Sequence, residues 1–366
     1  MGQSPDSNSY NDNKIGLPLI QGNADIKERI TVPQRYTNEP TKVCDKNSII
    51  MSVRAPVGSI AVSNQKICIG RGVCAINCKN NRFLYQLLIK HELSWKNIEQ
   101  GGTFTAINLN DIKNFQIYIT NENEQQKIAD FLSLIDQRIE KQRQLVESLK
   151  KYKRGLLSAI FERKIRFKDD NGNDYPEWNK CSMKDCVEFI RNGFSYEESF
   201  NNVKYIPISR IETIAERSID MTRIGKAKPP VSEDYRLKKG DILFSNINSI
   251  KHIGKTAFFD IDDVLYHGMN LLCIRPNSTI NNYFLFLLLN TKQIQKLNYQ
   301  HAKQAVNQCS IPVSDILHYP IEVPSLQEQE KVVSLFRYYN FNLVKNEDYL
   351  LSLNIIKQGL LQQMFI

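Results

Sequence analysis

The sequence predicts an α+β protein made of two similar α/β domains, each followed by one long helix. Three observations support this prediction. The chain repeats itself after about 200 residues, each copy changes from short β-type runs to an uninterrupted helical stretch, and both stretches carry an apolar stripe typical of a coiled coil. With 366 residues and 42% hydrophobic content, the chain is long enough for two or three cores.

The repeat is visible without gaps. The pairs that lie 204 positions apart are Glu124–Ile128 with Glu328–Val332, Arg154–Leu157 with Gln358–Leu361, and Phe161 with Phe365. An earlier match, Asn80–Tyr85 with Asn281–Phe286, has an offset of 201, so small insertions separate the two matches. The chain is therefore a tandem duplication in which each copy has two parts.

The first part of each copy is typical of a small mixed domain. Short β-type runs such as Ser48–Val53 and Asp241–Ser245 are interrupted by Gly, Pro and Asn, which end strands and form turns. These mixed segments predict one domain over residues 1–120 and a second over residues 167–322. The second begins with a polar, turn-rich linker at Phe167–Pro176.

The second part of each copy is helical, over residues 121–166 and 323–366. Asn121 or Asn123 can cap the first helix, and Pro324-Ser325 opens the second. Apolar residues recur in steps of four and three, a 3.5-residue period that calls for a partner helix. The stripe residues are Ile128, Leu132, Ile135, Ile139, Gln142, Val146 and Leu149 in the first helix and Val332, Phe336, Tyr339, Leu343, Asn346, Leu350 and Leu353 in the second. The equivalent amides at 142 and 346 could fix the register. Each helix could instead pack only on its own domain.

Composition favours a polyanionic partner, because 48 Lys and Arg against 39 Asp and Glu give a net charge of +9. The apolar runs are too short for a membrane span, and the polar start Met1–Asp6 does not resemble a signal peptide, so we expect a cytoplasmic protein. The eight cysteines form no C-x-x-C pair, and no histidine lies at zinc-ligand spacing. We therefore expect reduced thiols and no metal site.

The catalytic motifs are incomplete. Ser249–Thr256 ends in Gly-Lys-Thr, but Ser249 occupies the position where a phosphate-binding loop needs its first glycine. The Pro-Pro step in Lys228–Val231 lacks the aromatic and Asn or Asp residues that hold a flipped base in an amino-methyltransferase. The sequence therefore predicts no catalytic residue in this chain.

The sequence does contain residues suited to binding DNA. Cations neutralise phosphates, and Arg, Lys, Asn and Gln on loops read base edges. Such residues follow corresponding strands in both domains. The candidate DNA-binding residues are Arg54, Arg71, Gly101, Gly102 and Thr103 in the first domain and Asn246, Asn248, Lys251, His252, Lys255, Lys303 and Gln304 in the second. Any single one could be only a solvated surface side chain, and the glycines could be plain turn formers.

The duplicated unit resembles the specificity subunit of type I restriction-modification systems. Three segments carry the resemblance: Asn123–Leu132, with its Glu-Gln-x-Lys-Ile core, Arg154–Phe161 at the end of the long helix, and Phe167–Trp178, which resembles the entry into a target recognition domain. The resemblance covers nearly the whole chain. It is specific in the helices and weak in the recognition domains.

This resemblance implies two target recognition domains that each read one half of a bipartite DNA sequence. They would be separated by two conserved helices that form an antiparallel coiled coil and act as a ruler. It also implies docking of two methyltransferase subunits and of ATP-dependent restriction subunits. S-adenosylmethionine, Mg²⁺ and ATP would belong to those partners, and this chain would be non-catalytic. The alternatives are a stand-alone DNA methyltransferase or nuclease with unrecognised motifs, and a coiled-coil interaction protein without a DNA role.

One departure concerns the first domain. Met1–Ser4 aligns with Asn192–Ser195, so the first copy has no counterpart of Tyr175–Ile190. A late start codon, a truncation or a recombined gene would each produce this difference. We expect the first recognition domain to be N-terminally incomplete and less stable than the second.

Overall fold

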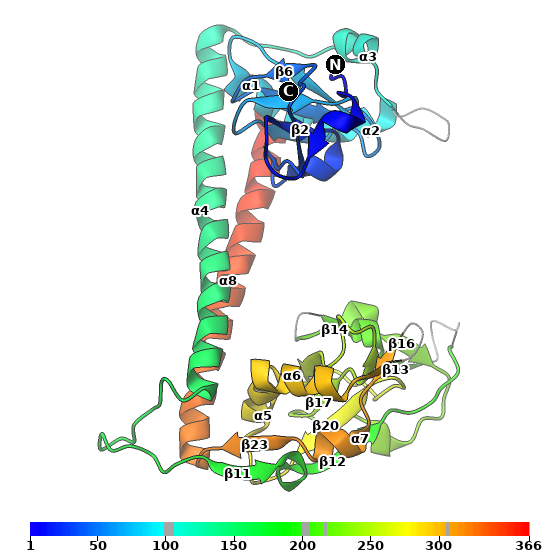
Figure 1. Cartoon of the computed structure of the whole chain (residues 1–366), viewed down its shortest axis with the longest axis vertical. Coiled ribbons are helices and arrows are strands. Elements are labelled where there is room, and N and C mark those ends of the chain that lie inside the picture. Colours follow the sequence, from blue (N-terminus) through cyan, green and yellow to red (C-terminus); the bar gives the residue numbers. More distant parts are fainter. Residues whose placement is uncertain (99–105, 200–204, 216–217, 305–307, 366) are drawn as a thin grey trace. The chain divides into compact units, whose positions relative to one another are not determined.

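The described part of the chain forms two compact units, and each unit contains a part of both long helices. The structure is a computed structural model that describes residues 1–98, 106–199, 205–215, 218–304 and 308–365 (Figure 1). Unit 1 consists of Met1–Val146 and Lys345–Ile366, and unit 2 consists of Glu147–Val344. The long helices are α4 (Glu122–Phe161) and α8 (Leu326–Met364). Each unit therefore joins one domain to the start of one helix and the end of the other.

The domain of unit 1 is built on two five-stranded sheets. The first has the order β1 (Tyr10–Asn11), β5 (Arg35–Thr37), β2 (Leu17–Ile20), β9 (Ile67–Ile69), β6 (Val43–Cys44), and the second has the order β10 (Val73–Ile76), β7 (Ile49–Ser52), β8 (Ile60–Val62), β4 (Ile30–Thr31), β3 (Ile26–Lys27). The helices are α1 (Asn81–Lys90), α2 (Glu92–Ile98) and α3 (Leu109–Asn114). Strand β7 is buried on both faces, because Ile49 and Met51 join the cluster of Phe83 while Ile50 joins that of Ile20.

The domain of unit 2 is built in the same way around a four-stranded sheet of order β12 (Val187–Asn192), β20 (Leu272–Pro276), β17 (Ile242–Phe244), β19 (Thr256–Phe258). The smaller sheets pair β11 (Asn179–Ser182) with β23 (Pro320–Val323), β13 (Ile206–Ile208) with β16 (Gly225–Ala227), β14 (Ile214–Ala215) with β15 (Ser218–Ile219), and β18 (Ile247–Asn248) with β22 (Cys309–Ser310) and β21 (Lys303–Gln304). The helices of this domain are α5 (Asn282–Leu289), α6 (Lys292–His301) and α7 (Val313–Leu317). Like β7, β17 is buried on both faces: Ile242 and Phe244 face one cluster and Leu243 faces another.

The predicted duplication recurs in the packing of the two units. In unit 1, the ring of Phe83 in α1 lies 5.3 Å from that of Phe365, just beyond α8. In unit 2, the ring of Phe284 in α5 lies 5.2 Å from that of Phe161, the last residue of α4. These four residues are equivalent in the sequence repeat. Each domain is therefore closed by the C-terminal end of the helix that belongs to the other copy.

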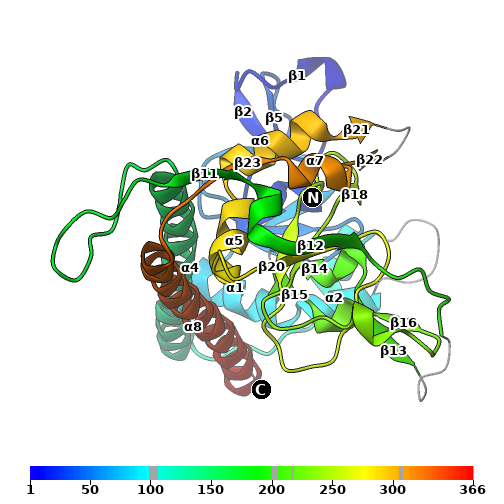
Figure 2. The ribbon, with the colours of Figure 1, turned by 90° about the horizontal axis from the view of Figure 1, so that it is seen from below.

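Within each unit, α4 and α8 lie side by side and run antiparallel (Figures 1 and 2). In unit 1, the Gln142 amide donates to Asn346 Oδ1 at 2.9 Å, and Lys357 forms an ion pair with Asp136. Residue numbers thus fall along α4 as they rise along α8. The same order holds in unit 2, where the rings of Tyr152 and Tyr339 lie 5.5 Å apart and Ile160, later in α4, shares a cluster with Val332, earlier in α8. The predicted antiparallel helix pair is confirmed.

None of the 14 stripe residues is fully exposed. The structure buries Ile128, Leu132, Ile139, Gln142, Val146, Val332, Phe336 and Leu353, and half-buries Ile135, Leu149, Tyr339, Leu343, Asn346 and Leu350. Some of them also pack on a domain: Ile128 and Leu132 share a cluster with Phe83, and Phe336 shares one with Phe284. The helices therefore pack both on each other and on the domains.

The Glu-Gln motif at each helix start has a structural explanation. Asn121 Oδ1 accepts the Glu124 N–H at 3.0 Å, so Asn121 rather than Asn123 caps α4. The side chain of Gln125 then reaches back and donates to the carbonyl of Thr120 at 2.7 Å. In α8, the equivalent Gln329 donates to the carbonyl of Pro324 at 2.9 Å. The glutamine of the motif thus ties the first helical turn to the strand or loop before it.

The two domains differ at one sheet edge. Strand β20 of unit 2 lies between β12 and β17, whereas β10, its counterpart in unit 1, pairs only with β7 among the described residues. The Gly193 N–H donates to the carbonyl of Leu271 at 3.3 Å, and the equivalent Gly2 N–H donates to that of Val73 at 2.9 Å. Gly2 of unit 1 therefore takes the place of Gly193, the residue that follows β12 in unit 2.

The counterpart of β23 is also different. Residues 116–119 of unit 1 form no strand, and Ile117 is 36% exposed, whereas its equivalent Ile321 of β23 is 2% exposed and pairs with β11. The next residue of unit 1, Tyr118, is 89% exposed. Backbone without ladder hydrogen bonds opens more easily than paired backbone. The predicted lower stability of the first domain is consistent with this difference and stays a prediction.

Limited proteolysis with chymotrypsin should therefore cut at Tyr118 before it cuts any aromatic residue that the structure describes in unit 2. The physical reason is that a protease needs several residues of accessible, unpaired backbone. The cut is measured by mass spectrometry of early fragments, and Tyr118→Ser should delay it. Cleavage of unit 2 as early as unit 1 would contradict the prediction.

Candidate nucleic-acid interface

Two loops with the same backbone framework leave the central strands of the two domains. We call residues 53–59 of unit 1 the arginine loop and residues 246–255 of unit 2 the lysine loop. In the arginine loop, the Gly58 N–H returns to the carbonyl of Ser52 at 2.9 Å. In the lysine loop, the Gly254 N–H returns to the carbonyl of Ser245 at 2.8 Å. Both loops are therefore closed by the same hydrogen bond to the last residues of a buried strand.

A second shared hydrogen bond fastens each loop to the chain segment before α3 or α7. The Ile107 N–H donates to the carbonyl of Val53 at 2.8 Å, and the Ile311 N–H donates to that of Asn246 at 2.9 Å. Both isoleucines are buried and lie 204 positions apart. The two loops are thus equivalent, although the sequence between the anchoring residues differs in length and in side chains.

In unit 2, this hydrogen bond helps to bring together residues that are far apart in the sequence. Strand β22 pairs with both β18 and β21, so that Cys309 lies opposite Asn248 on one side and Gln304 on the other. Lys303 and Gln304 are exposed, as are Lys251 and Lys255. Neither Lys251 nor Lys255 forms an ion pair with any described residue. The lysine loop and β21 therefore form one surface that carries uncompensated positive charge.

Two of the predicted DNA-binding residues, Asn246 and His252, are not fully exposed. Asn246 is only 5% exposed, and its amide donates to the carbonyl of Ile311 at 3.4 Å, so it supports the loop and does not face solvent. The reason is that the inward alternation of β17 continues through Asn246. His252 is half-buried, with a buried Nδ1 that has no partner among the described residues. The Asn248 side chain is held in the turn by Ser245 and Ser249.

In unit 1, Arg54 and Arg71 are both exposed. Arg54 lies beside Ala106 in an isolated β-bridge. The predicted residues Gly101, Gly102 and Thr103 lie outside the described residues. Arg71 follows β9. Close packing requires a glycine at the next position, Gly72, because a Cβ atom there would lie 2.1 Å from the carbonyl oxygen of Gln21. The segment that carries Arg71 therefore packs directly against the residues after β2.

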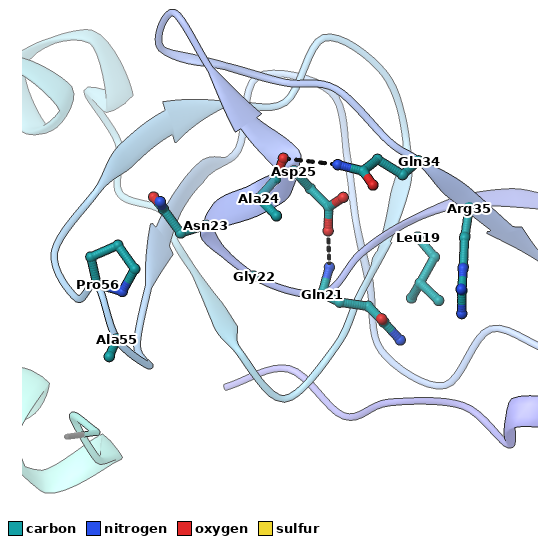
Figure 3. A pocket seen from close by; sticks show the side chains of 10 residues that line it. All are labelled: Leu19, Gln21, Gly22, Asn23, Ala24, Asp25, Gln34, Arg35, Ala55 and Pro56. Carbon is teal, nitrogen blue, oxygen red and sulfur yellow. Dashed lines mark hydrogen bonds between the residues drawn. The ribbon is translucent and has the colours of Figure 1, made fainter. Parts of the chain in front are cut away.

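Sequence reasoning missed a polar groove beside the arginine loop (Figure 3). It has a volume of about 640 Å³ and is lined by Leu19, Gln21, Gly22, Asn23, Ala24, Asp25, Gln34, Arg35, Ala55 and Pro56. The only local signal was a Gln-Gly-Asn step directly after a β-type run. Nothing in the sequence joins that step to Arg35 or to the arginine loop, because the sheet brings these segments together.

Three buried titratable side chains of the described residues are held in their uncharged forms. Burial raises the pKa of the Cys74 thiol to about 11 and that of the Cys186 thiol to about 12, so both stay protonated at neutral pH. Burial lowers the pKa of His267 to about 4, so this side chain is uncharged. The described residues contain no group of three His, Cys, Asp or Glu side chains that could hold a metal ion, and no described helix is long and apolar enough to cross a membrane.

The comparisons with known proteins agree on one family. A sequence model described as the type I restriction modification DNA specificity domain matches residues 1–151 and 175–351. The putative type I restriction enzyme MjaX specificity subunit of Methanocaldococcus jannaschii is 37% identical over 211 residues, which cover 56% of this chain and 49% of that protein. The alignment thus spans about half the length of that relative. The MjaIX specificity subunit of the same organism is 24% identical over 360 residues, covering 90% of this chain and 81% of the relative.

Solved structures show the same fold. The crystal structure of the type I restriction-modification S subunit from M. genitalium superposes with a TM-score of 0.59 at 17% identity, covering 100% of this chain and 92% of the other. A structure from work on complex assembly and conformational transition of the type I R-M system gives a TM-score of 0.58 at 17% identity, covering 99% and 93%. At this identity the likeness concerns the fold alone.

The lysine loop should depend on the left-handed backbone of Gly254, whose φ is +73° and whose Cβ would lie 2.2 Å from Asn298 Nδ2. Replacing it, Gly254→Ala, should lower the free energy of unfolding by about 1–3 kcal/mol. Thermal or urea unfolding measures this change. The matched control is Gly155→Ala in α4, where a Cβ meets open space and where we expect a gain of about 0.5–1 kcal/mol. Equal effects of the two substitutions would contradict the prediction.

Proposed function

The chain belongs to the type I restriction-modification DNA specificity family, and from this premise we propose that it reads a two-part DNA sequence, with one half-site for the domain of each unit. The observation that carries the proposal is the pair of equivalent loops. The arginine loop and the lysine loop share their anchoring hydrogen bonds but present different side chains, Arg54 in one and Lys251 with Lys255 in the other. Two copies of one framework with different exposed side chains are what two different half-sites require.

The charges of the two loops support DNA as the partner. Exposed lysines without a carboxylate partner are available to neutralise phosphates, and contacts to phosphate position a protein on the duplex without reading its sequence. Arginine and glutamine beside them can hydrogen-bond to base edges. In this proposal the chain supplies recognition and no catalysis, and it acts in the cytoplasm, where the DNA would be.

The helices supply surfaces suited to two equivalent partner subunits. Large apolar side chains are exposed at the same repeat positions of α4 and α8: Leu134 is 62% exposed and its equivalent Tyr338 is 64% exposed. Two further exposed pairs, also 204 positions apart, are Leu145 with Tyr349 and Tyr152 with Ile356. Exposed apolar side chains that gather on one element mark interaction sites.

We propose that these helix positions dock two methyltransferase subunits and that ATP-dependent restriction subunits join the assembly. S-adenosylmethionine, Mg²⁺ and ATP would then be bound by those partners and not by this chain.

The proposal is tested by expressing the chain with the methyltransferase subunit of its own system in a host without DNA methylation. Mapping methylated adenines across the genome should give a bipartite motif. Exchanging residues 178–320 for the corresponding domain of another family member should change one half-site and leave the other intact. A motif that does not change after the exchange, or a chain that transfers methyl groups by itself, would overturn the proposal.

The lysine loop should also control the salt dependence of DNA binding. For the purified complex, Lys251→Ala with Lys255→Ala should make the slope of log affinity against log salt shallower by about 0.9 for each phosphate that is no longer neutralised. The weakening should be similar for specific and non-specific duplexes, measured by fluorescence anisotropy at several salt concentrations. Lys180→Ala, an exposed lysine on β11 of the same unit, is the matched control. A double variant with the slope of the control would contradict the prediction.

A further inference from the structure

We infer that the polar groove of unit 1 reads bases of that unit's half-site, with Gln21, Asn23 and Arg35 as the side chains that set its specificity. The inference rests on the proposed function and assigns residues to it that the sequence did not indicate. Three segments meet in the groove (Figure 3). They are the residues that follow β2, the start of β5, and the tip of the arginine loop at Ala55 and Pro56.

The backbone of the groove is held firmly. The Asp25 side chain is buried and accepts the Gln21 N–H at 2.7 Å, while the Val32 N–H donates to the carbonyl of Asp25 at 2.8 Å. The Gln34 amide closes the same turn by donating to the carbonyl of Ala24 at 3.2 Å. Side chains on such a backbone are presented in a fixed position, which base reading requires.

The side chains in the groove keep free hydrogen-bonding capacity. Arg35 is exposed, and Gln21 and Asn23 are half-exposed. Among the described residues, no hydrogen bond or ion pair involves the side chains of these three residues. The one carboxylate of the groove, Asp25, accepts the Gln21 N–H and forms no ion pair with Arg35.

The arginines of unit 1 divide into two groups. Four have partners: Arg29 pairs with Glu92, Arg82 with Asp130, Arg143 with Glu140, and Arg138 stacks on Tyr349. The other three, Arg35, Arg54 and Arg71, have no ion-pair partner in the described chain, and all three lie on segments that border the groove. Positive charge without compensation is therefore concentrated around a pocket with free amides.

This combination of side chains selects one class of ligand. Arginine makes a bidentate contact to guanine O6 and N7, and asparagine or glutamine makes one to adenine N6 and N7 in the major groove. Neighbouring arginines can hold the adjacent phosphates. Duplex DNA offers both kinds of group at once, so we assign the groove to base edges of the half-site.

The equivalent segment of unit 2 carries different exposed side chains, and this difference supports the assignment. The segment after β13 in unit 2 aligns with the segment after β2, and the preceding Ile208 is as deeply buried as Leu19. At the position of Gln21, however, unit 2 has Arg210, which is paired with Glu198 at 3.0 Å. The framework is thus repeated while the exposed chemistry is not, as expected for side chains that read two different half-sites.

The test uses the complete complex, expressed with its methyltransferase subunit, and the genome-wide map of methylated sites. Asn23→Ala and Arg35→Ala should each relax one or more positions of a single half-site, with discrimination reduced roughly 5- to 150-fold at the affected base pair. The other half-site should stay unchanged. Lys66→Ala, an exposed lysine between β8 and β9 of the same domain, is the control and should leave the whole motif unchanged.

Arg35→Lys distinguishes base reading from phosphate contact. Lysine keeps the charge but lacks the planar two-pronged donor, so the base-reading role predicts the same relaxed half-site as Arg35→Ala. A parental motif in Arg35→Lys, or in all groove variants with unchanged thermal unfolding, would overturn the inference. Weaker binding to every duplex without a change of motif would also overturn it. The absence of any bipartite motif in the parent complex would instead defeat the proposed function.

Discussion

Each domain of this protein completes its hydrophobic core with the end of a helix that begins in the other copy. The core of unit 1 includes Leu361 and Phe365 from the end of α8, and the core of unit 2 includes Leu157 and Ile160 from the end of α4. Burying one such side chain contributes about 1.5–3 kcal/mol, whereas a whole domain is stable by about 5–15 kcal/mol. Neither domain can therefore be fully packed until both helices are in place, and the stability of each is coupled to the antiparallel seam.

This constraint explains which residues the two copies share. The residues that close the cores are repeated, as are the buried isoleucines that anchor the loops, Ile107 and Ile311. The loop side chains between the anchors are not repeated. Substitutions of exposed side chains usually change stability by less than about 0.5 kcal/mol, so these positions can vary without loosening the seam. In the proposed function, recognition and stability are thus assigned to different residues of the same framework.

The sequence predicted the features that depend on local pattern. The helices, their 3.5-residue stripe and the repeat could be read directly, because helical periodicity and capping residues are local properties. Even there, Asn121 and Asn123 were equally good caps by residue type, and the hydrogen bond to Glu124 decides for Asn121. The burial of Asn246 could not be predicted, because the sequence does not show how far the inward alternation of β17 extends. The groove was missed because Gln21 and Arg35 become neighbours only through the pairing of β2 with β5.

The net charge of +9 does not by itself show where the positive charge is concentrated, whereas the pattern of ion pairs does. Three arginines without carboxylate partners border one groove of unit 1, and their mutual repulsion is reduced when a polyanion binds. Salt also screens this repulsion, over a Debye length of about 8 Å at physiological ionic strength. Salt weakens the attraction to phosphates in the same way, but it affects hydrogen bonds between an amide and a base edge much less. In the proposed role of the groove, Arg54 and Arg71 therefore supply affinity that depends on salt, while hydrogen bonds from Gln21, Asn23 and Arg35 to base edges supply discrimination that is less sensitive to salt.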